Sequence, residues 1–465
     1  MEPDPLAALP PDVPALAALE RGRLLRKAVP RGAHAGWAAA VERDPVATVV
    51  ASNDGRLPEL VPIRMGRMAA SPFAFLRGSA AVMAADLAQT PTIGENVQLC
   101  GDAHLANFGI FASPERRLVF DLNDFDETHI GPWEWDVKRL AASFVVASRA
   151  NGFPEATCRE MARFVGRTYR QTVRRYASMR ALEVWYSSID VEQLIARAAA
   201  NPAIGRRYRG AIEIPLDEAR RRDHLSALGK LSVVDPVTGG WLIRDRPPLL
   251  QRLPDDDPSR AVLPVLYKGY LRSLSADRRV LVEKHRLLDV ALKVVGVGSV
   301  GTRCYVALFA GPAGGPLILQ VKEARASVLE PYVKHGRHAH QGERVVTGQR
   351  IMQAVTDTFL GWTRSPVTHT EYYVRQLHDM KYSIDPAVLR PVGMELYAQV
   401  CAWALARAHA RSGNPATIAG YLGVGEMFDD ALAAFATAYA DQTERDHAAL
   451  SAAISSGTVA AEIGV

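Results

Sequence analysis

Two short loops in the first third of the chain carry acidic and amide side chains at a spacing that suits phosphoryl transfer. Asp102 and Asn107 stand five residues apart between two apolar segments, and Asp124 follows the next apolar segment. Phosphoryl transfer requires a carboxylate that orients or deprotonates the attacking hydroxyl, and oxygen ligands for the Mg²⁺ that bridges the phosphates of ATP. The first loop provides an acid and an amide, and the later acid would complete a metal site. The alternative interpretation is that these residues cap turns between strands, where Asp, Asn and Gly are common.

The spacing of this run resembles the aminoglycoside and choline kinase branch of the protein-kinase-like superfamily. In that branch Gly-Asp-x-x-x-x-Asn precedes an apolar-Asp-aromatic step, and this chain continues with Gly131 seven residues after Asp124 and Asp136 five residues later. The resemblance implies that Asp102 is the catalytic base and that Asn107 and Asp124 bind Mg²⁺. It also implies that Asp136 buttresses the catalytic loop. The branch usually has His immediately before Gly-Asp, whereas this chain has a cysteine, so the packing behind the loop must differ.

A second candidate site is a glycine-rich stretch in which Gly296, Gly298 and Gly301 form a GxGxxG pattern around Ser299. In a dinucleotide-binding fold such a pattern leads directly into a helix. Here it leads into residues 303–309, which are β-branched and aromatic and predict a strand. A glycine loop between two antiparallel strands resembles the kinase arrangement, in which backbone N–H groups cover the phosphates. These three glycines and the serine are therefore the predicted nucleotide-binding residues of the loop.

The next apolar stretch, 317–324, contains a single lysine, Lys322. A lysine in a buried strand needs an acidic partner or a phosphate, because burying a lone ammonium is costly. A kinase places at this point the lysine that contacts the α- and β-phosphates, and by this resemblance Lys322 is a catalytic and nucleotide-binding candidate. The following helix should supply its acidic partner, with Glu343 as the first candidate and Glu330 as the second. A surface-facing Lys322 and a solvated Glu343 are the alternatives.

The periodicity of apolar residues predicts a mainly helical chain with one sheet-rich island near 286–380. Spacings of three and four predict amphipathic helices in five segments, 133–180, 257–290, 338–356, 391–412 and 427–454. Strands are expected at 97–99, 117–120, 358–362 and 372–377, and from 290 through 321 with a break at 311–316. Residues 1–20 are expected to be flexible, and residues 235–258 to form an irregular connector. The pattern favours an α+β fold, since the strand–helix alternation of a doubly wound fold is lacking.

The order of the two candidate sites along the chain is the reverse of that in ordinary kinases. Asp102 precedes Gly296 by almost 200 residues, so one shared site requires a circularly permuted two-lobed kinase-like fold. The helix 396–410 resembles the helix that normally leads into the catalytic loop, and the chain would be cut after it. The predicted parts are an N-terminal extension packing on the large lobe (1–95), the large lobe with its two loops and an insertion (96–285), the small antiparallel-sheet lobe (286–380), and helices completing the large lobe (381–465).

The run from Pro62 to Gly78, together with these features, resembles the uncharacterised bacterial domain-of-unknown-function family 2252 along nearly the whole chain. That family is grouped with the kinase-like fold, and the resemblance implies no substrate. The run contains Arg64, Arg67 and Arg77, whose guanidinium groups could bind an anionic substrate or the transferred phosphate. The interpretation favoured by the sequence is that these arginines tie the N-terminal segment to the large lobe.

Composition excludes several other classes of protein. The 465 residues, 48% hydrophobic and 23% charged, suit a globular protein of two lobes or domains. No run of about 18 apolar residues is present, so no membrane span is expected. Four dispersed cysteines without a CxxC pair indicate a reducing cytoplasm and argue against a structural zinc site. Dispersed basic residues and an aromatic content of 7% give little support to nucleic-acid binding.

These observations predict a cytoplasmic bacterial phosphotransferase that uses ATP and Mg²⁺ and acts on a hydroxyl of a small molecule or a protein. A kinase-like enzyme that transfers AMP and a nucleotide-binding regulator without catalysis are the alternatives. The candidate base argues against a regulator, because a pure binding module could dispense with it. Region 186–257, which no kinase core requires, is expected to shape the choice of acceptor.

Overall fold

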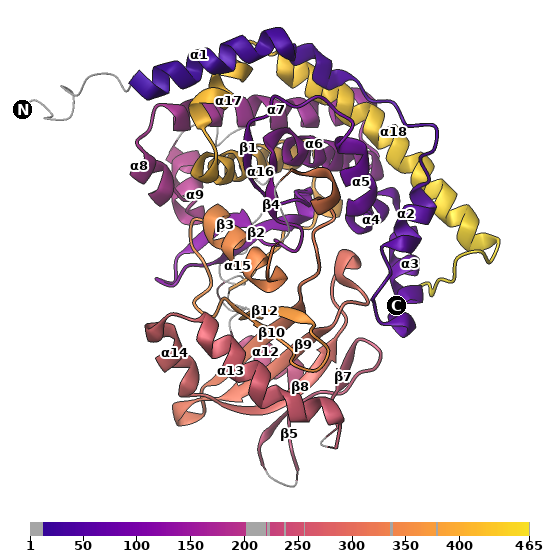
Figure 1. Cartoon of the computed structure of the whole chain (residues 1–465), viewed down its shortest axis with the longest axis vertical. Coiled ribbons are helices and arrows are strands. Elements are labelled where there is room, and N and C mark those ends of the chain that lie inside the picture. The colour runs from indigo at the N-terminus through magenta and orange to yellow at the C-terminus, as the bar shows by residue number, and fades with distance from the viewer. Residues whose placement is uncertain are drawn as a thin grey trace, which may run out of the picture.

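The computed structural model describes residues 13–200, 220, 224–236, 239–254, 256–334, 338–377 and 380–464. The architecture is mixed α+β, with helices gathered in one half of the molecule and an antiparallel sheet in the other (Figure 1). Segments from both ends of the sequence build the helical half, and the middle of the sequence builds the sheet half. The predicted α+β class is confirmed.

The sheet half is built on six antiparallel strands in the order β11-β12-β10-β9-β8-β7. Five of them lie within the expected island, namely β8 (Arg286–Lys293), β9 (Cys304–Ala310), β10 (Pro316–Glu323), β11 (Gly361–Arg364) and β12 (Glu371–Gln376). The helix α15 (Gln341–Met352) comes between β10 and β11 in the chain and packs against β11 and β12. Further elements around the sheet are α12 (His224–Leu231), β5 (Ser232–Val234), β6 (Trp241–Ile243), α13 (Leu263–Ser273) and α14 (Ala276–Glu283).

Three boundaries in this half differ from the sequence-based expectation. The strand expected at 358–362 begins only at Gly361, as β11. The edge strand β7 (Leu250–Arg252) pairs with β8, so the expected connector 235–258 contributes to the sheet. Three strand residues between prolines are too short a run to give a periodic signal. The expected helix 257–290 holds α13 and α14 but ends in β8, whose apolar residues had extended the helical pattern.

The helical half packs α6 (Trp133–Ala150), α7 (Glu155–Ala177), α16 (Pro391–Ser412) and α18 (Met427–Ser455) around one large apolar core. The rings of Trp133 and Tyr169 stack inside it with their centroids 5.4 Å apart. The expected helix 133–180 is two helices, because Gly152 adopts a φ of 73° and Pro154 follows it. Shorter helices complete this half, α8 (Ala181–Tyr186), α9 (Val191–Ala200) and α17 (Pro415–Leu422).

Two small antiparallel ribbons on the sheet-facing side of this half position the candidate loops. One pairs β1 (Asn96–Leu99) with β4 (His129–Pro132), and the other pairs β2 (Phe108–Ala112) with β3 (Leu118–Leu122). The strands expected at 97–99 and 117–120 are confirmed. Leu99 is opposite His129 and Phe108 is opposite Leu122, so the loops 100–107 and 123–128 connect the same ends of the two ribbons.

The N-terminal segment forms five helices, α1 (Val13–Ala28), α2 (Pro45–Ala51), α3 (Val61–Ala69), α4 (Pro72–Gly78) and α5 (Ala80–Leu87). The expectation of a flexible start is wrong for residues 13–20, and residues 1–12 lie outside the described ranges. α1 lies against α17 at such close range that a Cβ on Gly420 would be 2.1 Å from the carbonyl oxygen of Leu19. Close helix packing therefore orders this segment.

The N-terminal helices are fastened to the C-terminal part of the chain by buried polar contacts. Arg43 pairs with Asp86 at 2.8 Å and with Asp446 of α18 at 2.7 Å. The backbone N–H of Glu462 donates to the carbonyl oxygen of Pro62 in α3 at 2.9 Å. α3 and α4 are therefore held against α18 and the residues that follow it.

We predict that Arg43→Ala lowers the free energy of unfolding by about 3–5 kcal/mol, because it leaves two buried carboxylates without their cation. Denaturant unfolding followed by circular dichroism measures the change. The matched control is Arg23→Ala, which removes an exposed pair with Glu20 at 3.1 Å and should cost no more than about 1 kcal/mol. Equal stabilities of the two variants would contradict the role given to Arg43.

Candidate active site

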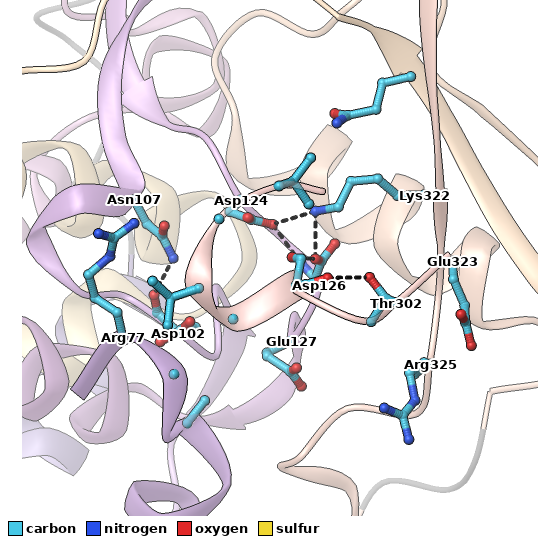
Figure 2. Close-up of a pocket in the computed structure, with 18 of the residues that line it drawn as sticks. Arg77, Asp102, Asn107, Asp124, Asp126, Glu127, Thr302, Lys322, Glu323 and Arg325 are labelled. Carbon is cyan, nitrogen blue, oxygen red and sulfur yellow. Dashed lines mark hydrogen bonds and ion pairs between the residues drawn. The ribbon is translucent and has the colours of Figure 1, made fainter. Parts of the chain in front are cut away.

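A cavity of about 930 Å³ lies where the loops 100–107 and 123–128 face the sheet half. Figure 2 shows Asp102 and Asn107 on one side of it, Lys322 on the other, and Asp124 between them. Seven residues predicted from the sequence line the cavity, namely Asp102, Asn107, Asp124, Gly296, Gly298, Ser299 and Lys322. Gly301 and Glu343 are not among the lining residues.

The loop that carries Asp102 is held from behind by Asp136, in the first turn of α6. The Asp136 carboxylate accepts hydrogen bonds from the backbone N–H groups of Cys100 at 2.7 Å and Gly101 at 3.0 Å. His409 of α16 places its Nε2 3.2 Å from the same carboxylate. Gly101 has a φ of 81°, and a Cβ there would lie 2.2 Å from the carbonyl oxygen of Glu127. Only glycine therefore fits this turn without displacing the neighbouring loop.

Cys100, directly before Gly101, links the two loops, because its thiol donates to the carbonyl oxygen of Asp124 at 3.2 Å. The imidazole next to Asp136 comes from His409, near the end of α16.

The Asp102 carboxylate is oriented by Arg139, which contacts its Oδ1 from α6. The Oδ2 atom lies 3.8 Å from Nε2 of His104, and the side chain keeps 18% of its surface exposed toward the cavity. Burial raises the pKa of Asp102, and the positive charge of Arg139 opposes this shift. One oxygen is thus fixed by a cation while the carboxylate is more basic than usual. Such a group suits the acceptance of a proton.

Lys322 occupies the far wall of the cavity on β10 and is only 2% exposed. Its Nζ lies 2.6 Å from Oδ2 of Asp126 and 3.7 Å from Oδ1 of Asp124. Burial disfavours the ammonium, yet these two carboxylates raise its pKa well above the ordinary value. Tyr373 donates to the other oxygen of Asp126 at 2.5 Å. The buried lysine therefore has its acidic partner in the loop 123–128.

The expected pairing of Lys322 with Glu343 is wrong. Glu343 is exposed in the first turn of α15, while the next residue, Arg344, is buried and points at the cavity loop. Arg344 donates to the carbonyl oxygens of Asp126 at 2.7 Å and Arg325 at 2.8 Å. Adjacent residues of a helix point about 100° apart, so the phase of α15 turns Glu343 away. Glu330, the second candidate, lies in a short 3₁₀ turn and is likewise not an ion-pair partner of Lys322 within the described ranges.

Two of the site residues were missed from the sequence, although the pattern contained a signal for each. Asp126 lies two residues after Asp124 in a turn, where its backbone N–H donates to Oδ1 of Asp124 at 3.3 Å, and both carboxylates lie near the same lysine; Asp side chains commonly bond the backbone two residues on in this way. Arg139 lies three residues after Asp136 on α6, and residues at this spacing share a helix face. Since Asp136 was expected to face the catalytic loop, Arg139 could have been expected there as well.

The glycine-rich loop connects β8 to β9, as expected, and Ser299 donates to Asp126 at 3.2 Å. It is held from outside by the N-terminal segment. Arg67 donates to the carbonyl oxygen of Val295 at 2.7 Å, and Arg56 donates to that of Val300 at 2.5 Å. Gly301 adopts a φ of 85° at the end of the loop and contacts Arg56 rather than the cavity.

The oxygen donors of Asn107 and Asp124 fit a magnesium ion that is shared with a phosphate ligand. The amide nitrogen of Asn107 donates to the carbonyl oxygen of Asp102 at 2.8 Å, so its oxygen remains as an acceptor. Asp124 keeps 34% of its side chain exposed beside it. The described residues contain no group of three or more His, Cys, Asp or Glu that could hold a metal alone. Mg²⁺ is usually held by one or two carboxylates together with substrate phosphates and water.

The electrostatic balance of the cavity favours an anionic ligand. Among the residues that the structure describes, nine lysine and arginine side chains line it, against five aspartates and glutamates. Several of the cations come from the sheet half, among them Lys293, Lys322 and Arg375. Like charges gathered in a partly enclosed space repel each other, and a polyanion would relieve this repulsion.

The sequence profile of a family described as an uncharacterized protein conserved in bacteria, DUF2252, matches residues 56–453. The chain belongs to this family. The matched region includes both loops, the glycine-rich loop and Lys322. No curated protein and no solved structure matches the chain. Within the described residues, no helix is both long and apolar enough to cross a membrane.

We predict that Lys381, in the wall of the cavity, loses its proton near pH 8. Burial and the nearby charge of Arg375 disfavour the ammonium and lower the pKa of Lys381 to about 8. Acetylation followed by mass spectrometry across a pH series should therefore modify Lys381 at a lower pH than exposed lysines, which titrate near about 10.4. A midpoint equal to that of the exposed lysines would contradict the proximity of these cations.

Proposed function

We propose that this protein is an ATP- and Mg²⁺-dependent phosphotransferase with a circularly permuted kinase-like fold, acting on a hydroxyl of a small molecule or a protein. The observation that carries the proposal is the distance of 3.7 Å between Lys322 Nζ and Asp124 Oδ1 in one cavity. These residues lie almost 200 positions apart. Each sequence constellation alone would make an incomplete nucleotide site, and together they supply a metal-binding acid and a phosphate-binding lysine.

The order of elements around the cavity supports the kinase-like part of the proposal. The sheet half runs from β8 through the glycine loop to β9, then to β10 with Lys322, α15, β11 and β12. This is the succession expected for the small lobe of a kinase, in which the glycine loop and the lysine strand precede the helix.

The contacts of α16 support the permutation. Ser412, the last residue of α16, accepts a hydrogen bond at 2.8 Å from the backbone N–H of Gln98 in β1. The end of α16 is thus adjacent to the strand that enters the loop with Asp102. In an unpermuted chain the same helix would lead directly into this loop.

The chemistry assigned to the residues follows from their positions. Asp102 accepts the proton of the acceptor hydroxyl, whose oxygen forms a bond to the γ-phosphorus while the bond to the leaving ADP oxygen breaks. Lys322 binds the α- and β-phosphates and exchanges part of its contact with Asp126 for them. Asn107 and Asp124 would hold Mg²⁺, which would supply positive charge against the phosphates. A cation-paired carboxylate next to the metal ligands favours transfer over nucleotide binding alone, because a regulator needs no base.

The transferred group distinguishes this proposal from AMP transfer. Incubation of the protein with γ-labelled or α-labelled ATP and cell extract, followed by identification of the labelled product, tests it directly. Label from the γ position supports the proposal. Label only from the α position supports AMP transfer, and neither label with tight ATP binding supports a regulator.

We predict that Asp102→Asn lowers turnover by a factor on the order of 10² to 10⁴ while nucleotide affinity stays within about threefold, because the amide keeps the shape but cannot accept a proton. Single-turnover transfer, or slow ATP hydrolysis until an acceptor is found, gives the rate. The matched control is Asp277→Asn at an exposed position of α14. Parental turnover in the Asp102 variant would remove this residue from the mechanism.

We predict that Asp124→Ala and Lys322→Ala weaken the binding of Mg²⁺–ATP, each by about tenfold or more, since each removes a charged contact. The loss in Asp124→Ala should disappear when ATP is titrated without Mg²⁺, whereas the loss in Lys322→Ala should persist. Calorimetry measures both affinities, with the exposed Lys284→Ala as control. Parental affinity in both variants would show that the cavity is not the nucleotide site.

A further inference from the structure

Arg77 lies in the last turn of α4, and its guanidinium faces the cavity beside Asp102 and Asn107 (Figure 2). Its Nε is buried without a hydrogen-bond acceptor among the described residues. The group lies over the ring of Phe73, 5.9 Å from the ring centre. It forms no ion pair with a carboxylate in the part of the chain that the structure describes; burial lowers its pKa, and the negative charges of Asp102 and Asp124 oppose this shift. A guanidinium with five donors is thus aimed at the cavity.

The neighbouring arginines of the N-terminal segment are used differently. Arg64 donates to the side chain of Asn53 and to the carbonyl oxygen of Gly78, and Arg56 and Arg67 hold carbonyl oxygens of the glycine loop. The expectation that the arginines of this run tie the N-terminal segment to the large lobe is not met by Arg64 and Arg67, because Arg64 bonds within the segment itself and Arg67 bonds the glycine loop of the sheet half. Arg77 differs from both, because its donors are not used in such contacts.

Arg77 lies between the glycine loop and the candidate base. A Cβ placed on Gly296 would be 4.0 Å from Nη2 of Arg77, and one on Gly298 would be 3.4 Å from its carbonyl oxygen. On its other side are Asp102 and Asn107. A phosphoryl group that passes from beneath the glycine loop to a hydroxyl at Asp102 would cross the space in front of this guanidinium.

The backbone on both sides of Arg77 is held by buried arginines, one of which also holds the candidate base. Arg139, the partner of Asp102, donates through Nη2 to the carbonyl oxygen of Leu76 at 3.0 Å. Arg64 donates to the carbonyl oxygen of Gly78 at 2.8 Å. Arg77 is therefore held at a constant position relative to Asp102, which is the preorganisation that electrostatic stabilisation of a transition state requires.

We propose that Arg77 binds the phosphoryl group during its transfer, as an arginine supplied in cis by the N-terminal segment. The inference rests on the proposed phosphotransferase function and assigns a further catalytic residue to it. The guanidinium stays protonated and donates hydrogen bonds to the equatorial oxygens, where charge is spread while the acceptor oxygen bonds to phosphorus and ADP leaves. Arginines in this role raise turnover by factors on the order of 10³ to 10⁵ in other phosphoryl-transfer enzymes.

The test uses a mimic of the transferred group, so that no acceptor is needed. The affinity of the full-length protein for ADP with Mg²⁺ is measured by calorimetry with and without aluminium fluoride, which occupies the position of the transferred phosphoryl group. The parent should bind ADP more tightly with aluminium fluoride. In Arg77→Ala this gain should fall on the order of 10- to 100-fold, as expected for lost charge-assisted hydrogen bonds, while the affinity for ADP alone changes by less than about threefold.

Two further variants keep the test decisive. Arg77→Lys keeps the positive charge but lacks the planar, forked guanidinium, so it should recover only part of the gain. If Arg77→Ala does not fold, the reduced gain in Arg77→Lys still tests the role of Arg77. Arg159→Ala, at an exposed position of α7, should behave as the parent. A parental gain in Arg77→Ala or Arg77→Lys would overturn the role of Arg77 while leaving the proposed function intact. A parent that binds ADP without any gain from aluminium fluoride would also overturn that role, and a parent that binds neither ADP nor ATP would overturn the proposed function itself.

Discussion

The geometry of the site depends on the buried carboxylate of Asp136. It accepts the backbone N–H groups of Cys100 and Gly101, and it lies against His409 of α16, so three segments of the helical half meet at one anion. Hydrogen bonds to a charged acceptor are worth more than neutral ones, and their loss in a buried place is costly. The turn at Gly101 is thereby fixed, and with it the direction in which Asp102 leaves the loop. Arg139, one helical turn after Asp136, contacts both the carboxylate of Asp102 and a carbonyl oxygen near the end of α4, and so fixes these two groups relative to each other.

The residues of the site that sequence reasoning found are those whose spacing is local. Asp102, Asn107 and Asp124 belong to two loops that neighbouring strands bring together, and Lys322 stands out because a lone ammonium in an apolar strand needs a partner. The partner itself could not be assigned in the same way. Glu343 lies on the expected helix and has the expected charge. The phase of α15, however, decides which side chain faces the loop 123–128, and it places the next residue, Arg344, against that loop. Asp126 reaches Lys322 only through the tertiary fold.

The elements of the fold were predictable where long periodic segments form the core, as in α7, α16 and α18. They were not predictable where order comes from close contacts between distant segments. α1 owes its place to the small size of Gly420, and β7 to an open edge of β8. The N-terminal segment contributes Arg56 and Arg67, which bond backbone carbonyl groups of the glycine loop, and such contacts leave no pattern of complementary side chains in the sequence. All of these contacts join segments that are far apart in the sequence, so a window of neighbouring residues contains no signal for them.

The attachment of the N-terminal helices to α18 has a consequence for synthesis on the ribosome. Asp102 and its loop leave the ribosome early, but His409, Asp446 and Glu462, which support that loop and the helices beside it, are made more than 300 residues later. A nascent chain that already contains the loops and the sheet half therefore has the contacts of Asp136 and Arg139 but lacks those from α16, α18 and the residues after α18. Domains generally fold as units during translation, and here the helical half cannot close before α16 and α18 emerge. Until then its early helices expose apolar faces, which makes the growing chain a client for chaperones that bind such surfaces.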